Sequence, residues 1–168
     1  METSKKILAL DSSGLVASVA VVEGNSTYSN LLAEYTVNYK KTHSQTLLPM
    51  LDEIANMTEL DLTTIDAIAI AAGPGSFTGL RIGSATAKGL GLALKKPLIS
   101  IPTVDALAYN LYGTDRLICP IMDARRNQVY TGIFEFRGNT MEVLEPQMAV
   151  DIEVIAEKLC ERQQDVIF

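Results

Sequence analysis

Two segments of the sequence repeat one pattern: an apolar strand, an aspartate, a short turn and a second strand. The first runs from the apolar residues 7–10 through Asp11 to a strand at 17–22. The second runs from 117–122 through Asp123 to a strand at 129–136. Each segment predicts a β-hairpin. Two hairpins that each place an aspartate at the end of the first strand indicate a chain of duplicated halves.

The segments between and after these hairpins predict an α/β fold with mixed sheets flanked by helices. The apolar run 65–72 is typical of a strand buried on both faces, and helical spacing surrounds it at 44–56 and 80–94. We expect a first lobe over residues 1–103 and a second over 104–168. The apolar run 166–168 has no turn or partner strand after it, so we expect the second lobe to be cut short.

Composition argues against several classes of function. The chain has 20 acidic and 14 basic residues, and an acidic protein is a poor stand-alone binder of nucleic acid. One histidine and two cysteines of unrelated spacing make a metal centre unexpected. The N-terminal apolar run 7–10 is too short for a signal peptide, and no apolar run is long enough to span a membrane. We therefore expect a cytoplasmic protein.

Three short segments are candidates for binding a nucleotide. The turn formed by Asp11, Ser12 and Ser13 could hold phosphate oxygens and hydrated magnesium, or it could simply close a hairpin. The run that contains Gly73 and Gly75 joins a strand to a helix start, which suits an anion. It matches neither the Walker nor the dinucleotide fingerprint. The third candidate is Asp123, followed by two arginines that could bind phosphate or only form a solvated turn.

Small residues recur every fourth position along the predicted helix 80–94 and just before it, at Gly79, Gly83, Ala87 and Gly91. Glycine inside a helix costs about 1 kcal/mol relative to alanine, so this stripe requires a reason. It could pack closely on the protein's own sheet or receive a helix of another subunit, and the spacing alone leaves both open. The apolar face of the helix 44–56 is a candidate partner surface, with these residues: Leu47, Leu48, Leu51 and Ile54.

Together these segments resemble the bacterial TsaB (YeaZ) family over almost the whole chain. The most specific match is the eleven-residue string GPGSFTGLRIG at 73–83. The other segments occur in the family's order: ILALDSS at 7–13, HSQ at 43–45, LLP at 47–49, AKGL at 87–90 and DAR at 123–125. The third residue of the HSQ segment is acidic in the family, and here it is Gln45.

The resemblance implies the two-lobed actin-like ATPase (ribonuclease H-like) fold and a non-catalytic subunit. Such a subunit supports TsaD, the threonylcarbamoyltransferase that modifies the tRNA adenosine next to the anticodon. TsaD-like proteins hold a metal with a histidine pair, and this chain has one histidine, so no catalytic residue is assigned. The resemblance implies a homodimer, a TsaD heterodimer through first-lobe helices, and action of the ATPase TsaE on that pair.

The resemblance also sets what we expect of ligands and surfaces. We expect no required cofactor and at most weak ATP or ADP binding with magnesium. Contact with tRNA would be indirect, through the complex. The interface is placed on the stripe from Gly79 to Gly91 and on the face from Leu47 to Ile54. Two alternatives stay open: a stand-alone ATPase or kinase of this fold, and a peptidase that uses His43 or Ser44.

Overall fold

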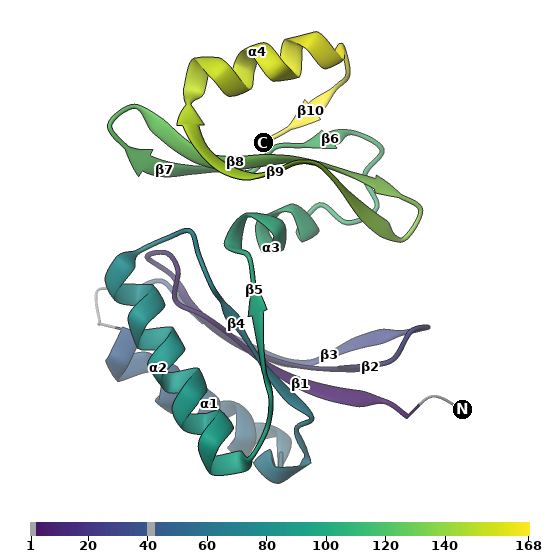
Figure 1. Cartoon of the computed structure of the whole chain (residues 1–168). Helices are drawn as coiled ribbons and strands as arrows, with labels where there is room; N and C mark the ends of the chain where they lie inside the picture. The colour runs from purple at the N-terminus through teal and green to yellow at the C-terminus, as the bar shows by residue number, and fades with distance from the viewer. Residues whose placement is uncertain (1–2, 40–42) are drawn as a thin grey trace. The chain divides into compact units, whose positions relative to one another are not determined.

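The computed structural model describes residues 3–39 and 43–168 of the chain. The chain forms two compact units, Met1–Ile101 and Pro102–Phe168, and each has its own sheet and its own buried core (Figure 1). Within the described residues, no helix combines the length and the apolar character that crossing a lipid bilayer requires.

The first unit is built on a five-stranded sheet in the order β3-β2-β1-β4-β5. Strands β1 to β3 form an antiparallel meander, and β4 and β5 run parallel to β1. The strands are β1 (Lys5–Asp11), β2 (Ala17–Gly24), β3 (Ser29–Val37), β4 (Ala67–Ala71) and β5 (Leu98–Ile101). The parallel pairing requires crossover connections, and helices supply both of them.

Helices α1 (His43–Thr58) and α2 (Phe77–Leu94) cover one face of this sheet side by side (Figure 1). A short 3-10 helix, η1 (Leu62–Thr64), leads into β4. Alternate residues of β1 and β2, such as Leu8 and Val19, point into the layer below the helices and are fully buried there. This layer fixes the position of α2 and of the loop that precedes it.

The second unit contains a sheet whose first strand is interrupted. Strands β6 (Leu117–Ile118) and β7 (Ile121–Arg125) pair with β8 (Gln128–Arg137), and the register is the same for both strands as far as Asp123. Pro120 lies between them and has no backbone N–H to donate to a ladder. Strand β9 (Thr140–Asp151) pairs with β8, and β10 (Val166–Ile167) runs parallel to β6. The unit also contains helices α3 (Thr103–Tyr109) and α4 (Ile152–Arg162).

The connectivity of the two units confirms the predicted duplication. The order β9-β8-β7/β6-β10 repeats the order β3-β2-β1-β4, with the same antiparallel and parallel pairings. Helix α4 connects β9 to β10 as α1 connects β3 to β4. The long strand β9 was not predicted, because its apolar residues are interrupted by Glu142, Glu145 and Pro146.

Carboxylates tie distant segments together in both units. Asp66, which precedes β4, accepts hydrogen bonds from Lys6 N at 2.8 Å and Lys5 Nζ at 3.0 Å on β1. The Lys6 bond is the main reason that the pKa of Asp66 lies below its usual value. On β9, Glu145 accepts from Lys158 Nζ at 3.0 Å and Arg162 Nη2 at 3.1 Å, both on α4. The bond from Lys158 contributes most to the lowered pKa of Glu145.

The two hydrogen bonds that Glu145 accepts from α4 predict that the stability of the fold depends on pH. Because the folded pKa of Glu145 is lowered, its contribution is complete above the pKa of an unfolded glutamate, about 4.3, and is lost as pH falls through the folded pKa. Glu145→Gln should therefore lower the Tm at pH 7, and the difference from wild type should shrink toward pH 3. Thermal unfolding followed by circular dichroism measures both. Glu157→Gln, at an exposed position on α4, should leave the Tm nearly unchanged at both pH values.

Candidate functional site

The structure brings two of the three predicted nucleotide segments together, at the carboxyl ends of the parallel strands β1 and β4. Ser76 N donates a hydrogen bond of 2.6 Å to Ser13 O, and Ser12 Oγ donates one of 2.9 Å to Gly79 O. The turn after β1 is thereby attached to the loop that precedes α2. Asp11, Ser12 and Ser13 thus form one cluster with the loop that contains Gly73 and Gly75.

The glycines of this loop are required by close approach and by backbone conformation. A Cβ added at Gly75 would overlap Ser13 O and would lie 2.9 Å from Ser13 Cβ. Gly73 has φ +102°, in the region that residues with a side chain rarely adopt. Ser76 then begins α2, because its side chain accepts a hydrogen bond from Gly79 N at 3.2 Å. The glycine-rich string therefore serves a tight junction between strand and helix.

Two polar side chains of the cluster, Asp11 and Ser12, form hydrogen bonds within it. Ser12 and Ser13 are buried, and the Ser12 hydroxyl has the Gly79 carbonyl as its acceptor. The Asp11 carboxylate accepts the Ser13 N–H at 2.7 Å, so it closes its own turn. A phosphate would have to compete with these bonds to reach the same groups.

Asp123 belongs to the second unit and repeats the local geometry of Asp11. Its Oδ1 atom accepts the Arg125 N–H at 2.7 Å, the same bond to the second residue along that Asp11 makes. Asp123 itself is exposed. Both duplicated aspartates therefore hold the turns that follow them, which is the structural role that turn-forming Asp residues commonly have.

The stripe of small residues on α2 faces the protein's own sheet. A Cβ at Gly79 would overlap Ser12 O, and one at Gly83 would overlap Ser12 Oγ and lie 3.0 Å from Ile70 Cδ1. Ala87 is fully buried, and a Cβ at Gly91 would lie 2.9 Å from Leu98 Cδ2. The prediction that these four residues contact another subunit is wrong, because α2 packs on β1, β4 and β5 with no space for a partner.

The predicted partner face of α1 requires a similar correction. Leu47, Leu51 and Ile54 are 1%, 3% and 4% exposed and belong to the core of the first unit. They pack beneath the helix, so another protein cannot reach them while the unit is folded. Leu48 differs, because its side chain is 52% exposed. It is the one residue of the predicted interface that the structure leaves on the surface.

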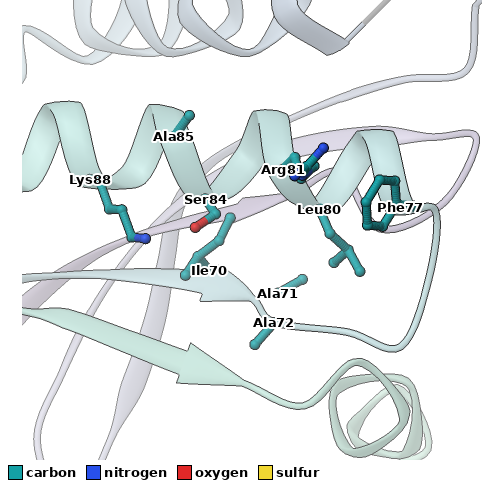
Figure 2. Close-up of a pocket in the computed structure, with 9 residues that line it drawn as sticks. All are labelled: Ile70, Ala71, Ala72, Phe77, Leu80, Arg81, Ser84, Ala85 and Lys88. Atoms are coloured by element: carbon teal, nitrogen blue, oxygen red, sulfur yellow. The ribbon is translucent and has the colours of Figure 1, made fainter.

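A groove of about 580 Å³ runs between α2 and the end of β4 (Figure 2). Its residues from β4 and the following loop are small or apolar: Ile70, Ala71 and Ala72. Its helical side is formed by Phe77, Leu80, Arg81, Ser84, Ala85 and Lys88. The Arg81 guanidinium lies 4.5 Å from the centre of the Phe77 ring, a cation–π distance. Two cations and no acid line this groove, a surface that sequence reasoning did not identify.

The remaining candidate residues, His43 and Cys119, are engaged in contacts with other parts of the fold. His43 Nε2 donates to Gly14 O at 2.9 Å and so ties the start of α1 to the β1–β2 turn. Cys119 Sγ lies 3.2 Å from Thr131 Oγ1, and burial raises the pKa of the thiol. Across residues 3–39 and 43–168, no three His, Cys, Asp or Glu side chains gather as a metal site would require.

The duplicated β-hairpin, parallel strand and crossover helix, with an aspartate at each first-strand turn, define the class of actin-like ATPase folds. A family model described as tRNA N6-adenosine threonylcarbamoyltransferase (TsaD) matches residues 30–163. The chain belongs to the TsaB (YeaZ) family within this group, as its curated relatives show.

The TsaB protein of Bacillus subtilis is 35% identical over 162 residues, which cover 96% of this chain and 69% of that protein. The TsaB protein of Haemophilus influenzae is 34% identical, over 95% of this chain and 66% of that protein. The solved structure of YeaZ from Pseudomonas aeruginosa superposes with a TM-score of 0.73 at 28% identity, over 87% of this chain and 67% of that one. The chain thus spans about two thirds of the length of these relatives.

Two glycine substitutions on α2 should change stability in opposite directions. Gly79→Ala places a Cβ on the Ser12 carbonyl, and overpacking of this kind costs about 1–3 kcal/mol. Gly89→Ala meets no atom within 4 Å and should stabilise the helix by about 1 kcal/mol. Urea unfolding followed by circular dichroism measures both. Equal effects of the two substitutions would contradict the packing of the stripe on the sheet.

Proposed function

We propose that this chain is a non-catalytic subunit that pairs with a TsaD-type threonylcarbamoyltransferase. In that role it supports threonylcarbamoyl modification of the adenosine next to the anticodon in tRNA, and it acts in the cytoplasm. Two findings support the proposal: the curated relatives are named as tRNA threonylcarbamoyladenosine biosynthesis proteins, and the matching family model is that of the transferase. Apart from the contact inferred in the next subsection, the partner would hold the tRNA.

The internal bonding of the nucleotide-type cluster is the observation that carries the non-catalytic role. Ser12 is 1% exposed and its hydroxyl already donates to Gly79 O, and Asp11 already accepts from Ser13 N within the same turn. A nucleotide phosphate that engaged Ser12 would have to displace the bond that attaches α2 to the turn after β1. We therefore propose that the chain requires no cofactor and binds ATP or ADP with magnesium weakly at most.

The histidine content supports the same role. The resemblance implies a metal-holding histidine pair in the catalytic relatives, and this sequence has His43 alone. The His43 ring is engaged with the Gly14 carbonyl at 2.9 Å. Transfer chemistry would then take place in the partner, and this chain would contribute a surface rather than a reacting group.

The outer faces of α1 and α2 support pairing through the first unit. Exposed acids lie on α1, at Asp52 and Glu53, and that helix contains no lysine or arginine. Exposed cations lie on α2, at Arg81 and Lys88, and that helix contains no acid. Exposed apolar side chains accompany them: Leu48 on α1, and Phe77 and Leu92 on α2, at 52%, 71% and 83% exposure.

This separation of charge suits a two-fold arrangement of helices. In a two-fold interface each patch meets the partner's copy of the complementary patch, so α1 of one protomer would face α2 of the other. A paralogue of the same fold could replace one protomer at this surface. We propose a homodimer when the chain is alone, a heterodimer with the TsaD-type partner, and action of a TsaE-like ATPase on that pair.

A single charge on the exposed face should break this pairing without unfolding the chain. Leu92→Asp buries an unpaired carboxylate in the proposed interface, and we expect at least a tenfold loss of heterodimer affinity with a Tm lowered by only a few degrees, because an aspartate in the last turn of α2 weakens the helix by about 1 kcal/mol. Light scattering during titration with the TsaD-type protein of the same organism measures the complex. Leu15→Asp, at a 90% exposed position in the β1–β2 turn, is the control and should bind as wild type does.

Reconstitution tests the function itself. When supplied with ATP and an activated threonylcarbamoyl donor, the chain, a TsaD-type partner and a TsaE-like ATPase should together transfer the threonylcarbamoyl group to adenosine in a tRNA transcript, with release of the donor's leaving group, and omission of the chain should abolish the product. Asp11→Asn should leave the yield largely unchanged, because this carboxylate closes a turn. ATP turnover by the chain alone that disappears in Asp11→Asn, together with no complex, would replace this proposal with the stand-alone ATPase.

A further inference from the structure

The turn between β7 and β8 places two arginines in a backbone conformation that disfavours them. Arg125 pairs with Gln128, so Arg126 and Asn127 form a two-residue hairpin loop. The φ angles of Arg125, Arg126 and Asn127 are 65°, 53° and 63°. Three consecutive residues with side chains thus adopt the left-handed region, where Cβ crowds the following carbonyl oxygen.

Hairpins of this geometry favour other residues. A two-residue loop with both φ angles positive is a type I′ turn, for which Asn-Gly is the preferred sequence. The register shifts between Asp123 and Arg125, where Ala124 has no partner, and glycine is the usual residue at a left-handed position such as that of Arg125. The chain has arginine at this position and arginine at the first loop position instead. Strained residues of this kind gather where a function requires their side chains.

The four residues of the tip are all of types that bind phosphate. Arg125, Arg126, Asn127 and Gln128 are exposed, and arginine, asparagine and glutamine side chains supply many of the hydrogen bonds to nucleic-acid backbones. Neither guanidinium has an ion-pair partner within the parts of the chain that the structure describes. The two arginines make the tip positively charged, whereas the whole chain has a formal charge of −6.

We infer that this hairpin tip binds phosphate groups of an RNA backbone. The inference rests on the proposed function, to which it adds a direct contact between this chain and the tRNA. An acidic protein partner fits less well, because no apolar side chain accompanies the arginines from 125 to 128, and protein interfaces depend on desolvated apolar anchors. Two carboxylates lie close by: Asp123, bonded to Arg125 N, and Asp151, paired with Gln128 across the sheet.

A double substitution separates an RNA contact from a structural role. Arg125→Gly combined with Arg126→Asn installs residues that the backbone prefers, so the Tm should rise. Affinity for a fluorescently labelled tRNA transcript should fall about tenfold at low salt. Loss of two phosphate contacts should also reduce the slope of log K against log salt concentration by about 1.8. Fluorescence anisotropy with the chain alone measures both quantities.

A matched control removes the same charge at a similar backbone position. Lys95 has φ 55° at the end of α2, so Lys95→Gly with Lys96→Gln also relieves a left-handed residue and removes two cations. This variant should gain Tm while its affinity for the transcript stays within twofold of wild type. Asp151→Asn removes a nearby negative charge and should strengthen RNA binding.

The outcomes are distinct from those that test the subunit role. A fall in Tm with unchanged RNA affinity in the arginine variant would show that the arginines only shape the turn, and the inference would fail. Absence of RNA binding by the wild-type chain at low salt would overturn it as well. ATP binding that depends on the two arginines, with RNA affinity unchanged, would assign the tip to a nucleotide. Complex formation with the TsaD-type partner is measured separately and does not depend on any of these results.

Discussion

The close approach of the β1–β2 turn to helix α2 is the constraint on which the first unit depends. Ser12 lies so near the helix that positions 79 and 83 have no room for a Cβ atom and are occupied by glycine. The Ser12 hydroxyl also donates a hydrogen bond to the Gly79 carbonyl. This contact fixes α2 on the sheet and leaves Arg81 and Lys88 exposed along the groove beside β4. The same contact bonds the Ser12 hydroxyl to the Gly79 carbonyl, so one packing interaction both positions α2 and joins the β1–β2 turn to the start of that helix.

The two units share one connectivity but differ in the residues that follow the aspartate of the first strand. In both, an aspartate after the first strand accepts the N–H two residues further along. In the first unit that turn continues into buried serines held by the glycine-rich loop. In the second it continues into exposed arginines at the tip of a hairpin. The two halves therefore share one frame, and they differ in whether the residues after the aspartate are buried or exposed.

Much of the fold could be predicted from the sequence, and the surface could not. Apolar runs that end at Asp11 and Asp123 identify both hairpins, because strand ends and turn residues are local signals. Strand β9 was missed because charged residues break its apolar pattern. The spacing of the stripe from Gly79 to Gly91 fits close packing against a sheet or against a foreign helix, and the family resemblance placed a partner there, whereas the stripe packs on the protein's own sheet. Only the three-dimensional neighbours decide between these cases.

The pairing of β1 with β4 also sets the order in which the chain can acquire structure. Lys6 N and the Asp66 carboxylate are 60 residues apart in sequence, so the first sheet closes only after the whole crossover through α1 exists. Consecutive strands in both units pair with near neighbours, β1 to β3 in the first unit and β7 to β9 in the second. Local pairing forms faster than pairing across a long loop. The amino-terminal strands, although synthesised first, therefore wait with one apolar face uncovered until α1 and β4 arrive.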